Sequence, residues 1–319
     1  MFEKNWIGGG NINLSHHASP HIRSAIHQLV EQYFVSDEMR KIAHEYMFYH
    51  EKNDFPFGGL TVLHYNVLKG ENKSIYQIAA AVELIILSFD LLDDWQDRDN
   101  NLPPWMDDER QALNIENGCL ILALSVFYQH LGEKSQSLQQ LIQFVNCSIQ
   151  GQFADLEDKP RNEDDYMSVI QNKSGSLTAM ACLAGALSAG HVHPDDLNRI
   201  ERYAVTIGVS AQLQNDLDDV LRLGGKNDLI QRKHTLATMY LLDHPSKNGK
   251  KLKRYYDHLI SKKQLLSDKE SMEAWIMASG VVFYTNAMKA MQQIRTEKII
   301  DQMSLDEDVK QQIKHLIET

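Results

Sequence analysis

The fold is decided by residues 79–97, AAAVELIILSFDLLDDWQD, where an apolar helical segment runs directly into a group of aspartates. A helix that is apolar on every side is normally central and surrounded by other helices. Asp90, Asp93, Asp94 and Asp97 follow the spacing i, i+3, i+4 and i+7, so they share one helical face over roughly 10 Å. Like charges so placed repel one another, and the segment therefore predicts a central helix whose acidic end faces a cation.

A second acidic group, QLQNDLDD at residues 212–219, ends another helical pattern far along the chain. Gln212, Asn215, Asp216 and Asp219 repeat the spacing that places side chains on one helical face. Oxygen ligands of this kind suit Mg²⁺, which keeps several waters and shares its shell with phosphate oxygens. Two such faces opposed across a cavity would hold Mg²⁺ and, through it, a diphosphate. This pattern favours an enzyme that ionises a diphosphate ester.

The remaining pattern is helical throughout, and no stretch alternates at the two-residue period of a strand. Ser19 and Pro20 predict the start of the first long helix, with the hydroxyl as N-cap and the proline at the first helical position. We therefore expect a loose N-terminal tail over 1–18 and a single all-α domain, a bundle of about a dozen helices, over 19–319. The helices are expected near 21–34, 37–51, 58–69, 74–98, 108–131, 135–157, 163–188, 194–222, 232–243, 249–262, 268–296 and 305–317.

Net charge, cysteine content and the lengths of the apolar runs indicate which partners and which cellular compartment to expect. A formal net charge of −11 over 319 residues argues against nucleic acid or an anionic membrane surface as the main partner. Cys119, Cys147 and Cys182 form no CxxC pair and fall in apolar stretches, as in proteins of a reducing compartment. Residues 1–5 lack the basic start of a signal peptide, and the apolar run over 179–187 is too short to span a bilayer. We expect a cytoplasmic protein.

The motifs, in their order, resemble those of the trans-isoprenyl diphosphate synthase (polyprenyl synthetase) family over roughly residues 37–300. The matching stretches are Asp93-Asp94-x-x-Asp97, GQFADL at 151–156, KSGSL at 173–177, Gln212-x-x-Asn215-Asp216-x-x-Asp219, and RKHTL at 232–236. This resemblance implies an isoprenoid synthase fold around a deep apolar pocket and a reaction that depends on two or three Mg²⁺ ions. The implied metal ligands are Asp93, Asp94, Asp97, Asn215, Asp216 and Asp219.

The resemblance also implies further site residues. Lys173 and Lys233 would contact the allylic diphosphate and act in catalysis beside Asp93, Asp94, Asp97 and Asp216, and Gln212 would contact the substrate. Asn215 stands where the family usually has the first aspartate of its second motif, which leaves Asp216 and Asp219 as the main metal contacts on that helix. The resemblance further implies a homodimer.

Two departures from the family pattern are informative. Ordinary members bind isopentenyl diphosphate with a GGKR-x-R-P segment, but here Gly58-Gly59 is followed by LTVLH at 60–64, with neither lysine nor arginine. The arginine pair that usually follows the first motif is replaced by Leu102-Pro103-Pro104, and only Arg98 is nearby. Neutral side chains cannot replace the cations that would bind a second diphosphate. The chain therefore retains the ionisation residues and lacks the cations of the isopentenyl diphosphate site.

This combination resembles the ComQ-type isoprenyl transferases, a subgroup that prenylates a tryptophan of a small peptide pheromone precursor in competence signalling. In that case, an indole replaces isopentenyl diphosphate as the nucleophile. Phe89, four residues before the first motif, would lie on the pocket wall and limit the donor to a C10 or C15 chain, as in geranyl or farnesyl diphosphate; the alternative is an ordinary core position. His64 and Arg98 are the remaining candidates for substrate contact. His64 would lie at the mouth that admits the acceptor, with packing in the core as the alternative.

Three other functions stay open at the level of sequence. One is short-chain isoprenyl diphosphate synthesis with an altered acceptor site, and a second is a terpene cyclase-like reaction in which the cation is quenched within the same molecule. The third is a regulatory subunit without catalytic activity. The intact Asp93, Asp94 and Asp97 count against this last function, because such subunits usually lose these aspartates.

Overall fold

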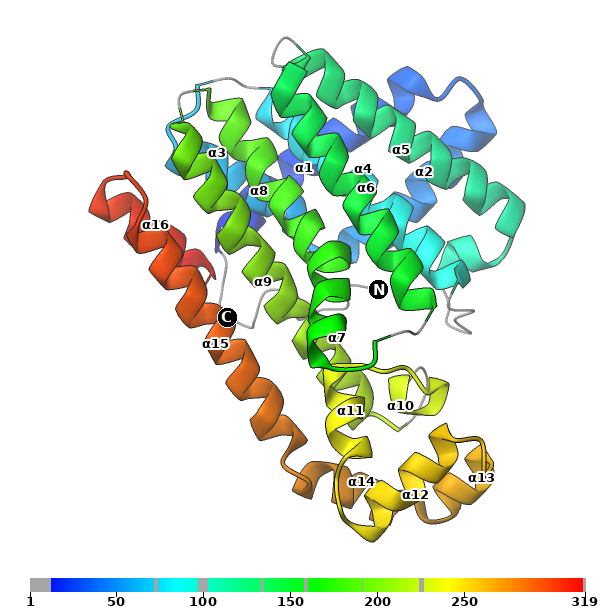
Figure 1. Cartoon of the computed structure of the whole chain (residues 1–319). Coiled ribbons are helices and arrows are strands. Elements are labelled where there is room, and N and C mark those ends of the chain that lie inside the picture. The colour runs from blue at the N-terminus through cyan, green and yellow to red at the C-terminus, as the bar shows by residue number, and fades with distance from the viewer. Residues whose placement is uncertain are drawn as a thin grey trace.

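The computed structural model describes residues 13–71, 74–96, 103–132, 135–157, 160–190, 192–223 and 227–317. Within these ranges every regular element is a helix, which confirms the all-α class (Figure 1). The α-helices are α1 Asn13–Tyr33, α2 Asp37–His50, α3 Pro56–Val67, α4 Ile75–Gln96, α5 Glu109–Leu131, α6 Ser135–Leu156, α7 Glu163–Ile170, α8 Ser176–Ala189, α9 Pro194–Leu221, α10 Asp228–Gln231, α11 Leu236–Leu242, α12 Lys247–Tyr256, α13 Lys262–Leu265, α14 Lys269–Ala278, α15 Val281–Asp301 and α16 Glu307–Ile317.

Helix α4 is the centre of the bundle, as its apolar sequence predicts. Residues 78–88 are all buried, and α1, α3, α5 and α8 pack around them. By length and hydropathy α4 could cross a membrane, but 78% of its most apolar window is buried inside the protein. That degree of burial is typical of the core helix of a helical bundle.

The core has one large part and two smaller ones. The large cluster joins α1 to α5 with α8 and the first half of α9, and the second lies among the short helices α10 to α14. A third, small cluster forms where α7, α9 and α11 meet. The 28-residue α9 contributes to all three, and α15 packs along it at the edge of the molecule (Figure 1). The acidic end of α9 therefore lies where the clusters meet.

The predicted start of the first helix is wrong. Helix α1 begins at Asn13, and Pro20 lies inside it. Ser19 does not act as an N-cap, because its hydroxyl donates to the carbonyl oxygen of Asp54 at 3.1 Å. Residues 13–18 are thus helical, and the rest of the expected tail, 1–12, lies outside the described residues.

Four other predicted helices are shorter or divided, and one of them, expected over 232–243, begins only at Leu236. The helix expected over 163–188 is interrupted by a π-helical segment, Gln171–Gly175, which overlaps the family-like stretch KSGSL at 173–177. The helix expected over 268–296 divides at Gly280, whose φ of +93° favours glycine. The helix expected over 249–262 ends at Tyr256. Apolar residues lie on both sides of Gly280 and soon after Tyr256, so periodicity alone did not reveal these two breaks.

Candidate active site

The two adjacent aspartates at the end of α4 have different surroundings. Asp93 is half-buried, and its Oδ1 lies 3.3 Å from Nζ of Lys173. Asp94 is buried and accepts a hydrogen bond of 2.8 Å from Nε1 of Trp105. Burial, with the negative charges of Asp90 and Asp93, raises the pKa of Asp94 to about 6. Asp93 therefore faces the lysine, whereas Asp94 points into the protein.

Aromatic contacts hold Asp94 in this position. The ring of Trp105 packs edge-on against Tyr46 and Tyr49 of α2, with centroids 5.7 and 5.1 Å away. Trp95 donates from Nε1 to the carbonyl oxygen of Trp105 at 3.2 Å. Asp94 stays a predicted metal ligand, and one of its oxygens, Oδ2, accepts a hydrogen bond from an indole N–H in a buried position.

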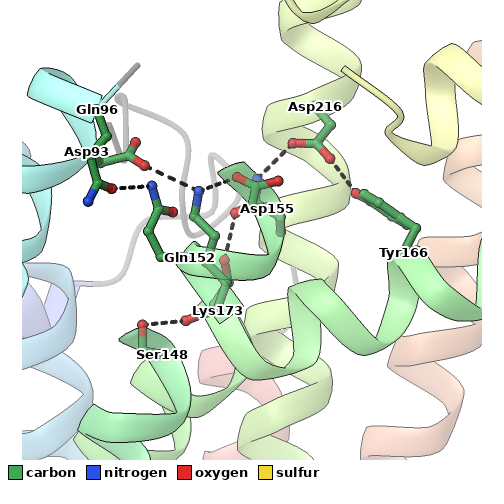
Figure 2. Close-up of polar contacts among 10 residues, drawn as sticks. Asp93, Gln96, Ser148, Gln152, Asp155, Tyr166, Lys173 and Asp216 are labelled. Carbon is green, nitrogen blue, oxygen red and sulfur yellow. Dashed lines mark hydrogen bonds and ion pairs between the residues drawn. The ribbon is translucent and has the colours of Figure 1, made fainter. Parts of the chain in front are cut away.

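Lys173 joins the first acidic motif to α6. Figure 2 shows its ammonium between Asp93 and Asp155, and Nζ lies 2.7 Å from Oδ2 of Asp155. The lysine lies on the π-helical segment, whose backbone is held by a 2.9 Å hydrogen bond from the hydroxyl of Ser148 to its carbonyl oxygen. The segment also passes directly over Gly151, where a Cβ atom would lie 2.3 Å from the backbone nitrogen of Lys173. A glycine is therefore required for this close approach.

The second acidic group is centred on Asp216 of α9, which is buried. One of its oxygens accepts a hydrogen bond from the hydroxyl of Tyr166 (Figure 2). The other oxygen accepts a hydrogen bond of 2.7 Å from Nε2 of Gln212. The Oε1 atom of Gln212 in turn accepts a 2.6 Å hydrogen bond from Ser174, which is on the π-helical segment next to Lys173. A continuous chain of side chains therefore connects the lysine-bearing segment to Asp216.

The charges in this region leave an excess of carboxylates. Burial, together with the negative charges of Asp228 and Asp155, raises the pKa of Asp216 above its usual range, and this effect exceeds the opposing hydrogen bonds from Tyr166 and Gln212. Buried carboxylates that destabilise one another's charge need a cation nearby. Oxygen donors from two helices, with this need for positive charge, fit a hard divalent cation.

The other predicted ligands and the second predicted lysine lie in less buried positions. Asn215 and Asp219 are half-buried on α9, on the same face as Asp216. Lys233 is half-buried just after α10, and its carbonyl oxygen accepts hydrogen bonds from Tyr256 at 3.0 Å and Thr238 at 2.7 Å. Two further candidates, Asp97 and Arg98, lie outside the described residues.

His64 does not lie where a substrate contact was expected. Its side chain is fully buried, with Nδ1 2.7 Å from the carbonyl oxygen of Leu60 and Nε2 2.5 Å from the hydroxyl of Tyr203. Burial lowers the pKa of His64 to about 4, so the ring is neutral at physiological pH. Because both nitrogens have partners in the core, the assignment of His64 to the acceptor mouth is corrected to a packing role. Phe89 is half-buried and packs against the main core.

Sequence reasoning missed several residues that the fold brings to the site. Asp155 lies in a motif that was recognised, yet only the tertiary structure pairs it with Lys173. Tyr166 had no signal at all, since a tyrosine on an amphipathic helix is commonly a packing residue.

A buried network on α4 was also missed. His50 of α2 lies 2.9 Å from Oε2 of Glu83 and 3.3 Å from Oδ2 of Asp90, and all three side chains are buried. Burial lowers the pKa of His50, but the two carboxylates raise it more, to about 9. The signal for this network was Glu83, an isolated acid in an apolar helix that required a partner.

Comparisons with known proteins show the family. The sequence model of the polyprenyl synthetase family matches residues 58–273. Tryptophan prenyltransferase ComQ of Bacillus subtilis (strain 168) is 31% identical over 303 residues, which cover 91% of this chain and 95% of that protein. Tryptophan prenyltransferase ComQ of Bacillus spizizenii is 28% identical over 262 residues, covering 81% and 92%.

The fold is also found among solved structures. The polyprenyl synthase from Caulobacter crescentus CB15, complexed with calcium and isoprenyl diphosphate, aligns with a TM-score of 0.79 at 18% identity. The alignment covers 97% of this chain and 96% of that one, so the two share the whole architecture.

Proposed function

The chain belongs to the polyprenyl synthetase family, and from this premise we propose that it transfers a prenyl group from an allylic diphosphate to a tryptophan of a small peptide. One observation carries the proposal. The acidic ends of α4 and α9 are linked through Lys173 and its neighbours, whereas on α3 the positions of the family's basic residues hold a buried, uncharged stretch, LTVLH at 60–64. The residues for ionising one diphosphate are present, and those for binding a second diphosphate are not.

Mg²⁺ is the cation that these oxygen donors suit. Asp93 of α4 and Asp216 and Asp219 of α9 would hold it, with Asn215 as a neutral ligand. Asp94 would keep the end of α4 in place through Trp105. Bound there, the metal would neutralise the leaving diphosphate so that the allylic carbon–oxygen bond can ionise.

Lys173 would bind the diphosphate directly. Its ammonium is already positioned by Asp155 and Asp93, which hold it in one place and leave little side-chain entropy to be lost on binding. Asp155 would act as a positioning residue, since it contacts the lysine and not the substrate. Lys233, which lies after α10, is proposed as the second lysine that contacts the diphosphate.

The acceptor is proposed to be an indole. An allylic cation needs an apolar, water-free environment, and an electron-rich aromatic ring can attack it without carrying a charge of its own. A neutral acceptor would therefore explain why α3 needs no cation. Phe89, half-buried four residues before Asp93, is proposed to limit the donor to a C10 or C15 chain. The name of the Bacillus relatives, tryptophan prenyltransferase, supports this choice of acceptor.

We also propose that the protein is cytoplasmic and forms a homodimer. Support for a dimer comes from large apolar side chains on the exposed surfaces of two neighbouring helices, Ile121 and Tyr128 on α5 and Ile149 and Phe153 on α6. Such surfaces on a water-soluble protein favour burial in an interface. Light scattering during size-exclusion chromatography should give about twice the chain mass of 36.5 kDa, and a mass equal to one chain would contradict the dimer.

One experiment distinguishes prenyl transfer to a peptide from chain elongation and from cyclisation. Purified protein and Mg²⁺ are incubated with labelled geranyl or farnesyl diphosphate, together with either isopentenyl diphosphate or a tryptophan-containing peptide. Label on the peptide supports the proposal, and a peptide with phenylalanine in place of tryptophan should stay unlabelled. Efficient formation of longer prenyl diphosphates would instead indicate chain elongation, and a volatile hydrocarbon made without any acceptor would indicate a cyclase.

A further inference from the structure

A histidine-rich cluster lies on the outer side of the first helical pair, apart from the acidic helix ends. His27 and Glu31 are one turn apart on α1, and His44 faces them from α2. Nε2 of His44 lies 2.8 Å from Oε1 of Glu31, and the two imidazole rings stack with centroids 4.3 Å apart. One ligand atom from each of the three side chains lies within 4.8 Å of the other two.

The donor set selects a class of metal ion. Two imidazoles and one carboxylate form a common zinc-binding set, whereas Mg²⁺ prefers oxygen donors alone. Zinc binds nitrogen and oxygen donors at about 2.0–2.2 Å, so two donors on one ion lie at most about 4 Å apart. The present spacing of up to 4.8 Å needs a movement of about an ångström, which partly exposed side chains can make by rotation.

The charges around the cluster favour a bound cation, except for the guanidinium of Arg40. The hydrogen bond from His44 is the main cause that lowers the pKa of Glu31, so this carboxylate is ionised at neutral pH. Arg40 opposes a cation, because its Nε lies 3.5 Å from Oε2 of the same carboxylate. The guanidinium also donates to the carbonyl oxygen of Phe34 at 2.9 Å and pairs with Asp37, so it has other partners when Glu31 turns to a metal.

We propose that His27, Glu31 and His44 form a surface binding site for Zn²⁺ that clamps α1 to α2. The site uses three protein ligands and leaves the remaining positions to water, as zinc does outside closed structural sites. The site is on the helix that also carries Tyr46 and Tyr49, and these tyrosines pack against Trp105, which donates a hydrogen bond to Asp94. Zinc bound here would stabilise the helical pair and would not take part in prenyl transfer. This inference does not depend on the proposed function.

The test uses the full-length protein after removal of metals with a chelator. Millimolar Mg²⁺ is added to occupy the acidic helix ends, and ZnCl₂ is then titrated by isothermal calorimetry. We expect one Zn²⁺ per chain with a dissociation constant in the micromolar range, and an increase in the melting temperature on binding. The substitutions His44→Ala and Glu31→Gln should each weaken binding at least tenfold, whereas His315→Gln, which changes an exposed histidine on α16, should have no effect.

A Co²⁺ titration gives an independent readout of the ligands. Co²⁺ bound by imidazole in a site of low coordination number produces visible absorption bands, which should disappear in His44→Ala and remain in His315→Gln. Circular dichroism establishes that each variant is folded before it is titrated. Zinc affinity that is unchanged in both His44→Ala and Glu31→Gln would overturn the proposal, as would the absence of saturable Zn²⁺ binding in the presence of Mg²⁺.

Discussion

The substitution Gly151→Ala tests how packing positions Lys173. The added Cβ would lie 2.3 Å from the backbone nitrogen of Lys173 and 2.7 Å from its Cα, and the nearest atoms are all backbone. Ordinary contacts begin at 3.4 Å, so α6 and the π-helical segment must separate by about 1 Å. Overpacking of this kind costs about 1–3 kcal/mol, against which alanine gains up to about 1 kcal/mol of helix propensity. With the full gain in propensity, the free energy of unfolding should fall by up to about 2 kcal/mol.

The effect on catalysis should be larger than the effect on stability. A displacement of about 1 Å in a positioned catalytic group can reduce the rate by about a hundredfold. We therefore expect kcat/KM for Mg²⁺-dependent release of diphosphate to fall by about 10- to 100-fold in Gly151→Ala. The assay couples released diphosphate to a colorimetric reaction, and urea denaturation gives the stability of the same preparation.

Gly118→Ala is the matched control. This residue is in the middle of α5, and its added Cβ would meet only side-chain atoms, 3.0 Å from Cε of Met39 and 3.1 Å from Cζ of Phe34. Flexible side-chain ends can move, so both stability and turnover should stay close to those of the wild type. If Gly151→Ala and Gly118→Ala both kept the wild-type kcat/KM, the close contact at Gly151 would not be what positions Lys173.

Three further predictions concern the acids, the buried histidine and the metal. Asp93→Ala and Asp216→Ala should each lower kcat/KM for diphosphate release more than a hundredfold, because each removes a carboxylate proposed to hold Mg²⁺ from a half-buried or buried position. His50→Gln should change how the free energy of unfolding depends on pH. In the folded wild type the pKa of His50 is about 9, against an ordinary 6.5, so the charged histidine stabilises the fold by roughly 3 kcal/mol. This stabilisation is complete below pH 6.5, is lost as the pH rises through 9, and can be measured by urea denaturation. Chelation with EDTA should abolish diphosphate release, and added Mg²⁺ should restore it.

Each of these predictions has an outcome that contradicts it. Asp195→Asn, at an exposed position near the start of α9, is the control for the acid variants, and equal losses in all three would indicate a general effect of charge. For the histidine, the difference in unfolding free energy between wild type and His50→Gln should shrink by about 3 kcal/mol from pH 6 to pH 9.5. A constant difference would mean that His50 is not charged in the fold. Turnover that persists in EDTA would move the chemistry away from a metal.

The sequence was sufficient for the architecture and for the two acidic helix ends. The first part of α4 is apolar on every side, which predicts a central helix, and it is one. Asp93 and Asp216 were predicted site residues, and the fold brings them to the two ends of one chain of contacts through Lys173, Ser174 and Gln212. Spacing on a single helix was enough here, because it is a local property of the chain.

Contacts between helices were beyond the reach of sequence reasoning. His64 was assigned by its place in a motif, yet it is buried against Tyr203 and has a role in packing. The motif likewise did not predict the hydrogen bond from Trp105 to Asp94. A motif fixes the order of residues but not which face of the helix meets another element. The pairing of Lys173 with Asp155 likewise depends on the π-helical segment, which no periodicity of apolar residues encodes.

The most direct test of the proposed function is the site of the label after incubation with labelled geranyl or farnesyl diphosphate, Mg²⁺, isopentenyl diphosphate and a tryptophan-containing peptide together. We predict that the label appears on the tryptophan, identified by tandem mass spectrometry, and that Asp216→Ala abolishes it. Label found only in longer prenyl diphosphates, with the peptide unmodified, would contradict transfer to tryptophan and would indicate that the uncharged α3 still supports chain elongation.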